Sequence, residues 1–267
     1  MTDNTTNIRE VVLDVLLEVL ENHNLSHIVL KQALEKYLFL ERQDRAFITR
    51  CVEGTLEYRI QIDAVIDRFS KVKTVKMKPV IREILRMSVY QILYMERVPD
   101  SAVCNEAVKL AKKRKFQGLS GFVNGVLRTI SREKEKLTWK DVSERYSIPQ
   151  WMLSMWEEMC GKETAETIAA SFLEERPLTV RFNESIAPAS ETIREMEDQN
   201  ITVEKSDVFP GIASIRGFDY LDRVNAFAEG KITVQDPSSS LAAQMASIDS
   251  GDFVLDVCSA PGGKAIH

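Results

Sequence analysis

The sequence predicts a mainly α-helical chain, in which a helical bundle is followed by a small α+β module and by the first strand of a Rossmann-like sheet. Three observations predict this fold class. Apolar residues recur at helical spacing throughout the first half of the chain. Alternation typical of strands begins only near residue 177. A short apolar run, followed at once by a glycine-containing turn, occupies 252–264.

The first half predicts an all-α bundle of about six or seven helices joined by short turns. A helix is predicted over 8–20, where Thr5, Thr6 and Asn7 are cap candidates, and another over 44–59. Further helices begin at Pro79, after Pro99-Asp100-Ser101, and at Ser120. The helix that begins at Pro79 is the most apolar, and we expect it at the centre of the bundle.

Residues 141–233 predict a small α+β module. Helices are expected after Pro149 and over 163–173. The stretch 177–183 alternates like a half-buried strand, and a polar helix follows over 190–199. Two further strand-like segments lie at 201–204 and 212–216.

Composition excludes several classes of protein. The chain has 267 residues, 44% of them apolar and 28% charged, which excludes a disordered, collagen-like or disulfide-rich protein. Apolar stretches are short and interrupted by charge, and the N-terminus lacks the apolar core of a signal peptide, so we expect no membrane span. Four widely spaced cysteines without a CxxC pair fit free thiols in a cytoplasmic protein.

Charge is distributed unevenly between the two halves. Residues 1–140 hold 25 Lys+Arg and 18 Asp+Glu, a net charge of +7, whereas 141–267 hold 10 and 22, a net charge of −12. The basic half favours a nucleic-acid partner. Lysines cluster at 71–78 and at 109–115; such runs either contact RNA or form a solvated face. The RNA-binding candidates of the second cluster are Lys109, Lys112, Lys113, Arg114 and Lys115.

His23 and His27 are the one pair at a spacing used in metal sites. No Glu or Cys nearby completes a ligand set and no HExxH is present, so we interpret both as surface residues and expect no metal.

Three phrases in the first half carry a family resemblance: LERQDRAFITRCVEGTLEYR, IREILRMSVYQILYMERVPDSAVCNEAVKLAKK and GLSGFVNGVLRTISRE. They resemble the NusB-type RNA-binding domain, and more closely the copy fused to the RsmB (Sun/Fmu) ribosomal RNA cytosine-5 methyltransferases. The match covers nearly all of 8–133. Asn105 and Asn124 lie in the most specific phrases, and they either bridge helix ends or contact RNA.

The α+β module is similar to the RNA-positioning module of the same family. The family's strand carries an Arg-x-Asn phrase, matched here by Arg181 and Asn183, so Arg181 becomes an RNA-binding candidate. The chain departs from the family at the entry to this strand, where it has Glu174-Glu175-Arg176-Pro177 in place of Asn-x-x-Pro-Pro.

The last residues are the most informative. An apolar run over 252–258 is suited to a buried parallel strand, and the glycine turn after it opens a nucleotide-binding unit. It is not a P-loop, because Cys258 and Ala265 stand where that motif needs Gly and Ser or Thr. With Val234–Ser239, it resembles the S-adenosylmethionine motif of the family. By that resemblance the cofactor-binding residues are Cys258, Ser259, Ala260, Pro261, Gly262, Gly263 and Lys264.

The resemblance implies an enzyme that transfers methyl groups to cytosine carbon 5 of 16S ribosomal RNA. We interpret Cys258 as structural, since the family's nucleophilic cysteine lies in later motifs, beyond His267. The chain is therefore expected to be inactive alone, with no catalytic residue of its own. The predicted parts are a NusB-like domain over 1–140, the RNA-positioning module over 141–233 and a truncated methyltransferase domain over 234–267. The alternative is a non-catalytic NusB-like module acting in transcription antitermination.

Overall fold

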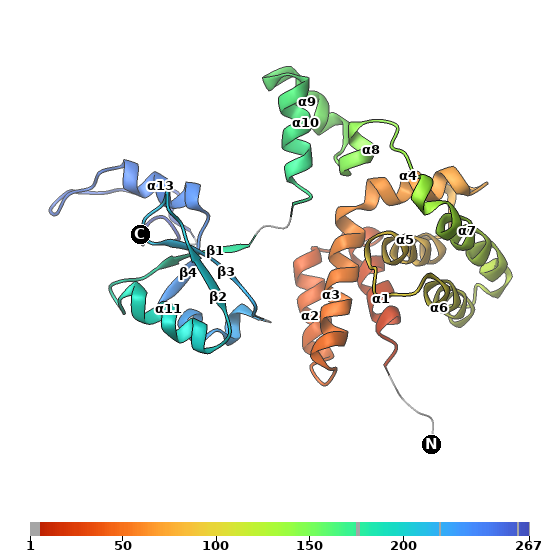
Figure 1. Ribbon diagram of the computed structural model, residues 1–267, viewed down its shortest axis with the longest axis horizontal. Helices are drawn as coiled ribbons and strands as arrows, with labels where there is room; N and C mark the ends of the chain where they lie inside the picture. The colour runs from red at the N-terminus through yellow and green to blue at the C-terminus, as the bar shows by residue number, and fades with distance from the viewer. Residues whose placement is uncertain (1–5, 175–176, 219, 261, 267) are drawn as a thin grey trace. The chain divides into compact units, whose positions relative to one another are not determined.

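A computed structural model of the chain describes residues 6–174, 177–218, 220–260 and 262–266 (Figure 1). Its contacts divide into two compact units, Met1–Glu174 and Glu175–His267. The first unit is helical and the second contains the β-sheet, which confirms the predicted change from a helical bundle to an α+β module.

The first unit is built from α-helices and short 3-10 helices. In chain order they are α1 (Ile8–Leu20), α2 (Ser26–Lys36), α3 (Arg42–Glu57), α4 (Arg59–Phe69), η1 (Thr74–Lys76), α5 (Pro79–Tyr94), α6 (Asp100–Lys113), η2 (Gln117–Leu119), α7 (Ser120–Glu133), η3 (Lys134–Lys136), α8 (Val142–Tyr146), α9 (Gln150–Cys160) and α10 (Lys162–Ser171). Every helix predicted in this part is present. The helices α2, α4 and α8 were not predicted.

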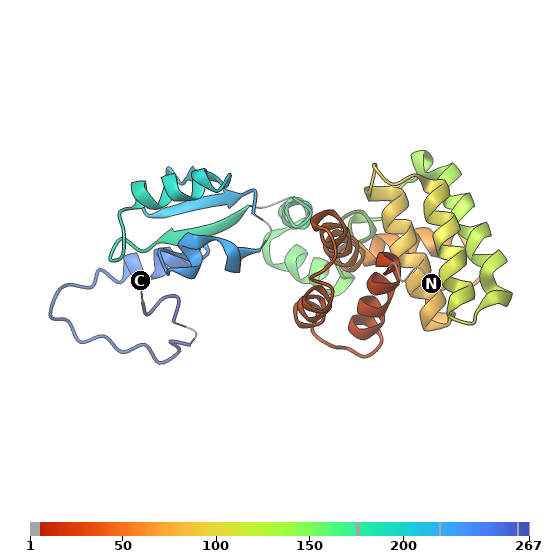
Figure 2. The same cartoon turned by 90° about the horizontal axis from the view of Figure 1, so that it is seen from below.

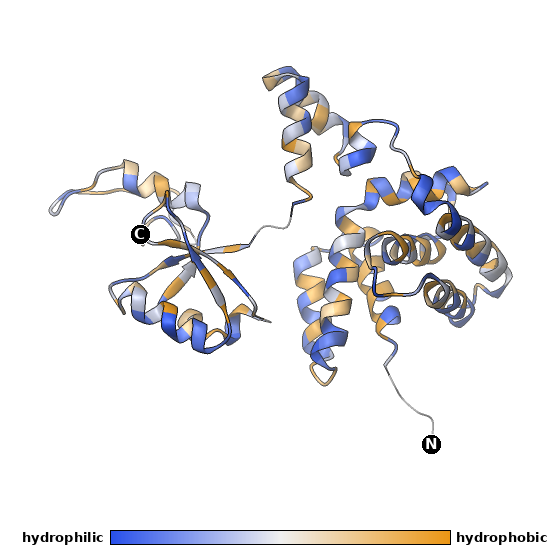
Figure 3. Cartoon of the chain, in the orientation of Figure 1, coloured by the Kyte–Doolittle hydropathy of each residue, from blue (hydrophilic) through white to orange (hydrophobic). Residues whose placement is uncertain are grey.

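Helix α5 lies at the centre of the first unit, as its apolar sequence predicts. It packs against α1, α3, α4, α6 and α7 (Figure 1). Its side chains from Ile81 to Ile92 are nearly all buried, whereas the outer helices bury one apolar face each. Figure 3 shows hydrophobic and hydrophilic residues alternating along these outer helices. Asn7 caps α1 as expected, because its Oδ1 accepts from the backbone nitrogens of Arg9 and Glu10.

The second unit is a four-stranded antiparallel sheet with the strand order β2-β3-β1-β4. Its elements are β1 (Leu178–Phe182), α11 (Ala189–Asp198), β2 (Thr202–Lys205), β3 (Ile212–Arg216), η4 (Leu221–Arg223), α12 (Asn225–Ala228), β4 (Ile232–Val234) and α13 (Pro237–Met245). Helix α11 covers one face of the sheet (Figure 2). On this face Ile193 and Met196 belong to the same buried cluster as Val180, Phe182 and Ile215. Arg181 alternates with Val180 and Phe182 and therefore belongs to the opposite face.

The strand predicted over 252–258 is wrong. Residues 252–256 have no regular secondary structure, and Phe253, Leu255 and Val257 are 94%, 75% and 83% exposed. A parallel strand needs hydrogen-bonded neighbours and helices over both faces. The described residues supply neither for this segment, so its apolar sequence alone does not make a strand.

The division of the chain into three domains stays a prediction, with bounds at 1–140, 141–233 and 234–267. The two compact units are defined by their internal contacts, and such contacts do not measure which parts fold independently. In the structure, α8 packs against α4 and α10, and these helices fall in the first unit. Across the described residues, no helix combines the length and apolar character needed to cross a membrane.

Candidate functional site

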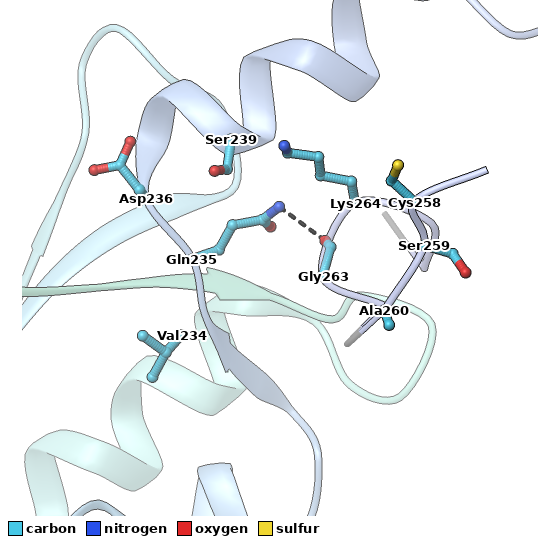
Figure 4. A pocket seen from close by; sticks show the side chains of 9 residues that line it. All are labelled: Val234, Gln235, Asp236, Ser239, Cys258, Ser259, Ala260, Gly263 and Lys264. Carbon is cyan, nitrogen blue, oxygen red and sulfur yellow. Dashed lines mark hydrogen bonds between the residues drawn. The ribbon is translucent and has the colours of Figure 1, made fainter. Parts of the chain in front are cut away.

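A pocket in the second unit brings together the two sequence segments that carry the cofactor motif (Figure 4). One segment runs from the end of β4 into α13, and the other is the glycine-containing loop near the end of the chain. The pocket has a volume of about 260 Å³ and is lined by Val234, Gln235, Asp236, Ser239, Cys258, Ser259, Ala260, Gly263 and Lys264.

The first turn of α13 forms one wall of this pocket. Asp236 caps the helix, since its Oδ1 accepts from the backbone nitrogen of Ser238 at 2.8 Å, and Pro237 occupies the first helical position. Ser240, one turn further, is completely buried. The Asp-Pro-Ser-Ser sequence thus fixes where the chain leaves β4 and turns into the helix.

The glycine loop forms the opposite wall. Gly262 has φ of +102°, in the region where L side chains are strained, so this turn needs glycine. Its nitrogen donates to the Ser259 carbonyl, and the Ile266 nitrogen donates to the Gly262 carbonyl at 3.0 Å. Of the predicted cofactor-binding residues, Cys258, Ser259, Ala260, Gly263 and Lys264 line the pocket. Gly262 shapes the loop and is not part of the lining, and Pro261 lies outside the described residues.

Cys258 does not occupy the buried position that the sequence predicted. The residue is exposed, and its backbone nitrogen donates to Asp256 Oδ1 at 2.9 Å in a turn. The predicted burial fails for the same reason as the strand, because no strand among the described residues covers this segment. The structural, non-catalytic role of Cys258 stays a prediction.

Arg181, an RNA-binding candidate from the sequence, lies beside this loop. The residue is 8% exposed, and its Nε donates to Gln235 Oε1 at 2.6 Å. Burial lowers the pKa of its guanidinium. Gln235 in turn donates to the Gly263 carbonyl at 2.8 Å. Sequence reasoning missed Gln235, whose only signal was its place in the motif directly before Asp236.

The residues that line the pocket suit the expected cofactor chemically, but the volume of the pocket is smaller than such a ligand requires. Its glycines and small side chains allow close approach to the backbone, as a nucleotide-like ligand requires. Sites that enclose a drug-sized molecule usually have volumes of about 300–1,000 Å³. At about 260 Å³, the described residues enclose a part of such a ligand.

The lysine cluster at the end of α6 is partly neutralised by α1. Lys113 pairs with Glu10, and Arg114 pairs with both Glu10 and Asp14. Lys109 pairs with Glu106 on its own helix at 2.7 Å. The remaining two lysines of the cluster, 112 and 115, are exposed.

A groove between α6 and α7 adds basic residues that the sequence did not single out. It has a volume of about 650 Å³, and its lining includes Asn105, Arg128 and Arg132. Arg128 Nε donates to Asn124 Oδ1 at 3.2 Å, so both asparagines of the specific phrases lie in or beside this groove. The sequence could have indicated this groove, because the two arginines are four residues apart and therefore share one face of the helix.

Metal ligands are not gathered in the described part of the chain, where no group of three or more His, Cys, Asp or Glu could hold an ion.

Comparisons with known protein families match two separate parts of the chain. The NusB family model matches residues 6–132. The family model described as "Methyltr_RsmF/B-like, ferredoxin-like domain" matches residues 148–215. The second match extends from α9 to β3 and therefore includes helices of the first unit and strands of the second.

Similar proteins align with nearly the whole chain. "Probable ribosomal RNA small subunit methyltransferase B" of Bacillus subtilis (strain 168) is 34% identical over 269 residues, covering 98% of this chain and 59% of that protein. The protein of the same name from Synechocystis sp. is 30% identical, covering 97% and 59%. A solved structure described as "Crystal Structure of PH0851" has a TM-score of 0.71 at 23% identity, covering 98% of this chain and 60% of that one, and shows the fold alone. The chain thus spans about 60% of the length of these relatives.

Proposed function

Because the chain belongs to the ribosomal RNA small subunit methyltransferase B family, we propose that it provides the RNA-binding part and the start of the cofactor site of such an enzyme. The enzyme would transfer a methyl group from S-adenosylmethionine to carbon 5 of a cytosine in small-subunit ribosomal RNA. The observation that carries the proposal is the joining of a NusB-type bundle to a pocket built from the two halves of the cofactor motif. A NusB-like antitermination module has no need of that pocket.

The RNA-binding face that we propose is the groove between α6 and α7. Lys112 lies seven residues after Asn105 on α6, two helical turns away on the same side of the helix. Arg128 and Arg132 flank the groove from α7, and all three basic side chains are exposed. The two arginines in the groove and the lysine on the neighbouring helix supply positive charges that suit an RNA backbone. The ion-paired residues 109, 113 and 114 would assist from the edge of this face.

Reversing three charges on this face is expected to remove most of the salt dependence of RNA binding. Contact with ~4 phosphates gives the unaltered chain a log–log salt slope of about −3 to −4. The variant Lys112→Glu/Arg128→Glu/Arg132→Glu should flatten the slope to about −1, since each lost phosphate contact removes about one unit. Filter binding or fluorescence anisotropy with a small-subunit ribosomal RNA fragment, measured over a range of salt concentrations, gives the slope.

A second triple variant with the same change in net charge serves as the control. Lys71, Lys76 and Lys78 are exposed and lie around η1, away from α6 and α7 in the sequence. Reversing these three to Glu should leave the slope within about one unit of the unaltered chain. Equal flattening by both variants would show a general charge effect and refute the proposed face.

Within the cofactor site, the loop residues Cys258–Lys264 would border the methionine and ribose parts of S-adenosylmethionine. The cofactor supplies the methyl group. Gly262 and Gly263 allow the backbone to approach it, and Asp236 and Lys264 offer charged groups at the pocket wall. These assignments rest on the motif and on the lining of the pocket.

The polypeptide of residues 1–267 alone is expected to bind the cofactor weakly and to transfer no methyl group. A pocket of about 260 Å³ encloses a part of the ligand, so we expect a Kd no tighter than about 1 mM. Calorimetric titration with S-adenosylmethionine measures the Kd, and labelled methyl incorporation into undermethylated small-subunit RNA measures transfer. Micromolar binding, or turnover that Cys258→Ala abolishes, would contradict this expectation.

A further inference from the structure

Arg181 and Gln235 face each other diagonally across the edge of the sheet. Strands β1 and β4 pair with Arg181 opposite Thr233, and the ladder continues beyond β4 because the Gln235 nitrogen donates to the Thr179 carbonyl at 3.2 Å. Thr179 and Arg181 are two residues apart, so their side chains share a face of the sheet. Gln235 is therefore the diagonal neighbour of Arg181, at a separation that long side chains span.

The hydrogen bonds between them have one possible direction. A guanidinium only donates, so the oxygen of the Gln235 amide must face Arg181. The NH₂ group of the same amide then points to the other side, where it donates to the Gly263 carbonyl (Figure 4). Arg181 Nη2 also donates to the Ile266 carbonyl at 3.4 Å. The guanidinium thus sets the orientation of the amide, and both residues hold the glycine loop.

Neither side chain belongs to the apolar core of the sheet. That core lies on the face covered by α11, among residues such as Val180 and Met196. Arg181 and Gln235 are nevertheless only 8% and 5% exposed, and burying polar groups costs free energy unless they are hydrogen-bonded. The bonds that satisfy them run to each other and to the loop at 263–266.

We propose that Arg181 and Gln235 are positioning residues that fix the cofactor loop to the β1–β4 edge of the sheet. The guanidinium of Arg181 orients the amide of Gln235, and the amide holds the Gly263 carbonyl in place. The sheet of the ferredoxin-like module thereby sets the shape of one wall of the pocket. The identity of the ligand rests on the proposed function, whereas the contact between sheet and loop does not.

The test is hydrogen–deuterium exchange of the chain with the substitution Gln235→Glu. An ionised carboxylate still accepts from Arg181, and it cannot donate to the Gly263 carbonyl. We expect the peptide covering 258–266 to exchange about fivefold faster, since a typical hydrogen bond contributes about 1 kcal/mol. Amides of β1 and β3 should keep their exchange rates, because the pairing with Arg181 is retained.

A matched control makes the same chemical change in the same sheet. Asn183 directly follows β1, and its Nδ2 donates at 3.2 Å to the carbonyl of Gly230, a residue outside the loop. Asn183→Asp should leave exchange of 258–266 unchanged. Arg181→Ala should loosen the loop as Gln235→Glu does, and Arg181→Lys, which keeps a donor, should restore part of the protection.

Two outcomes would overturn the proposal. Unchanged loop exchange in Gln235→Glu would show that the Gly263 contact does not hold the loop. Faster exchange in β1 and β3 as well would show that Gln235 only supports the sheet. RNA binding by Gln235→Glu should equal that of the unaltered chain, so a failure of the RNA-binding proposal is detected separately and leaves the exchange result valid.

Discussion

Replacing Arg86 with alanine is expected to lower the free energy of unfolding of the first unit by about 3–5 kcal/mol, the usual cost of removing one partner of a buried ion pair. Arg86 lies in α5 and joins two carboxylates. Its Nη1 donates to Glu83 Oε1 at 2.8 Å, and its Nε and Nη2 donate to Asp63 at 2.7 and 2.6 Å. The Glu83 side chain is completely buried, so the truncation leaves its carboxyl group with only the longer pair to Arg82 Nε, at 3.3 Å, among the described contacts.

Tryptophan fluorescence during urea unfolding reports this loss selectively, because all three tryptophans, at 139, 151 and 156, lie in the first unit. The double variant Arg86→Ala/Glu83→Gln should recover part of the loss, since it removes the buried acid together with its partner. Arg145→Ala, which breaks the exposed Arg145–Glu166 pair, should cost less than about 1 kcal/mol. If Arg86→Ala and Arg145→Ala lower the free energy of unfolding equally, the buried ion pair of Arg86 does not stabilise the first unit more than an exposed pair does.

The pH dependence of stability should follow Glu83. Burial raises the pKa of Glu83 from 4.5 to about 7, against the opposing effect of Arg86. The folded state then binds this proton more tightly than the unfolded state, so the contribution to stability is present below pH 4.5 and is lost as the pH rises through 7. Glu83→Gln should remove this decline between about pH 5 and pH 8, and an unchanged decline would assign it to other groups.

The local sequence determined most of the helices and none of the ion pairs between them. The apolar spacing of α5 predicted both the helix and its central place. Helix α2 was missed because Leu30 is its one buried residue in the described structure, so its apolar pattern is weak. Asp63 and Arg86 are 23 residues apart and pair only when α4 packs against α5, which no local pattern encodes.

In the candidate site, too, the local motif was predictable from the sequence and the long-range contacts were not. The glycine loop is a local motif, and five of its predicted residues do line the pocket. Arg181 and Gln235 are 54 residues apart, and only the β1–β4 register brings them together. In the segment 252–258 a local pattern made a wrong prediction. Its apolar sequence favours a strand, but a parallel strand forms only when neighbouring strands pair with it.

Gly54→Ala should destabilise the first unit by about 2–3 kcal/mol, although the same substitution normally stabilises a helix. Gly54 is buried in α3, and a Cβ there would overlap the ring of Tyr90. That ring packs beside Tyr58 and Tyr94, with centroids 6.1 and 5.4 Å away, so it has little freedom to move. The steric cost therefore exceeds the gain of about 1 kcal/mol in helix propensity.

Two further variants isolate this overlap in the same urea experiment. In a Tyr90→Ala background the ring is gone, and Gly54→Ala should become neutral or stabilising by up to about 1 kcal/mol. Gly125 lies on the exposed side of α7, where a Cβ would meet nothing within 4 Å, so Gly125→Ala should stabilise by about 0.5–1 kcal/mol. If Gly54→Ala instead behaves like Gly125→Ala, the close approach of α3 to Tyr90 is not a constraint on the bundle.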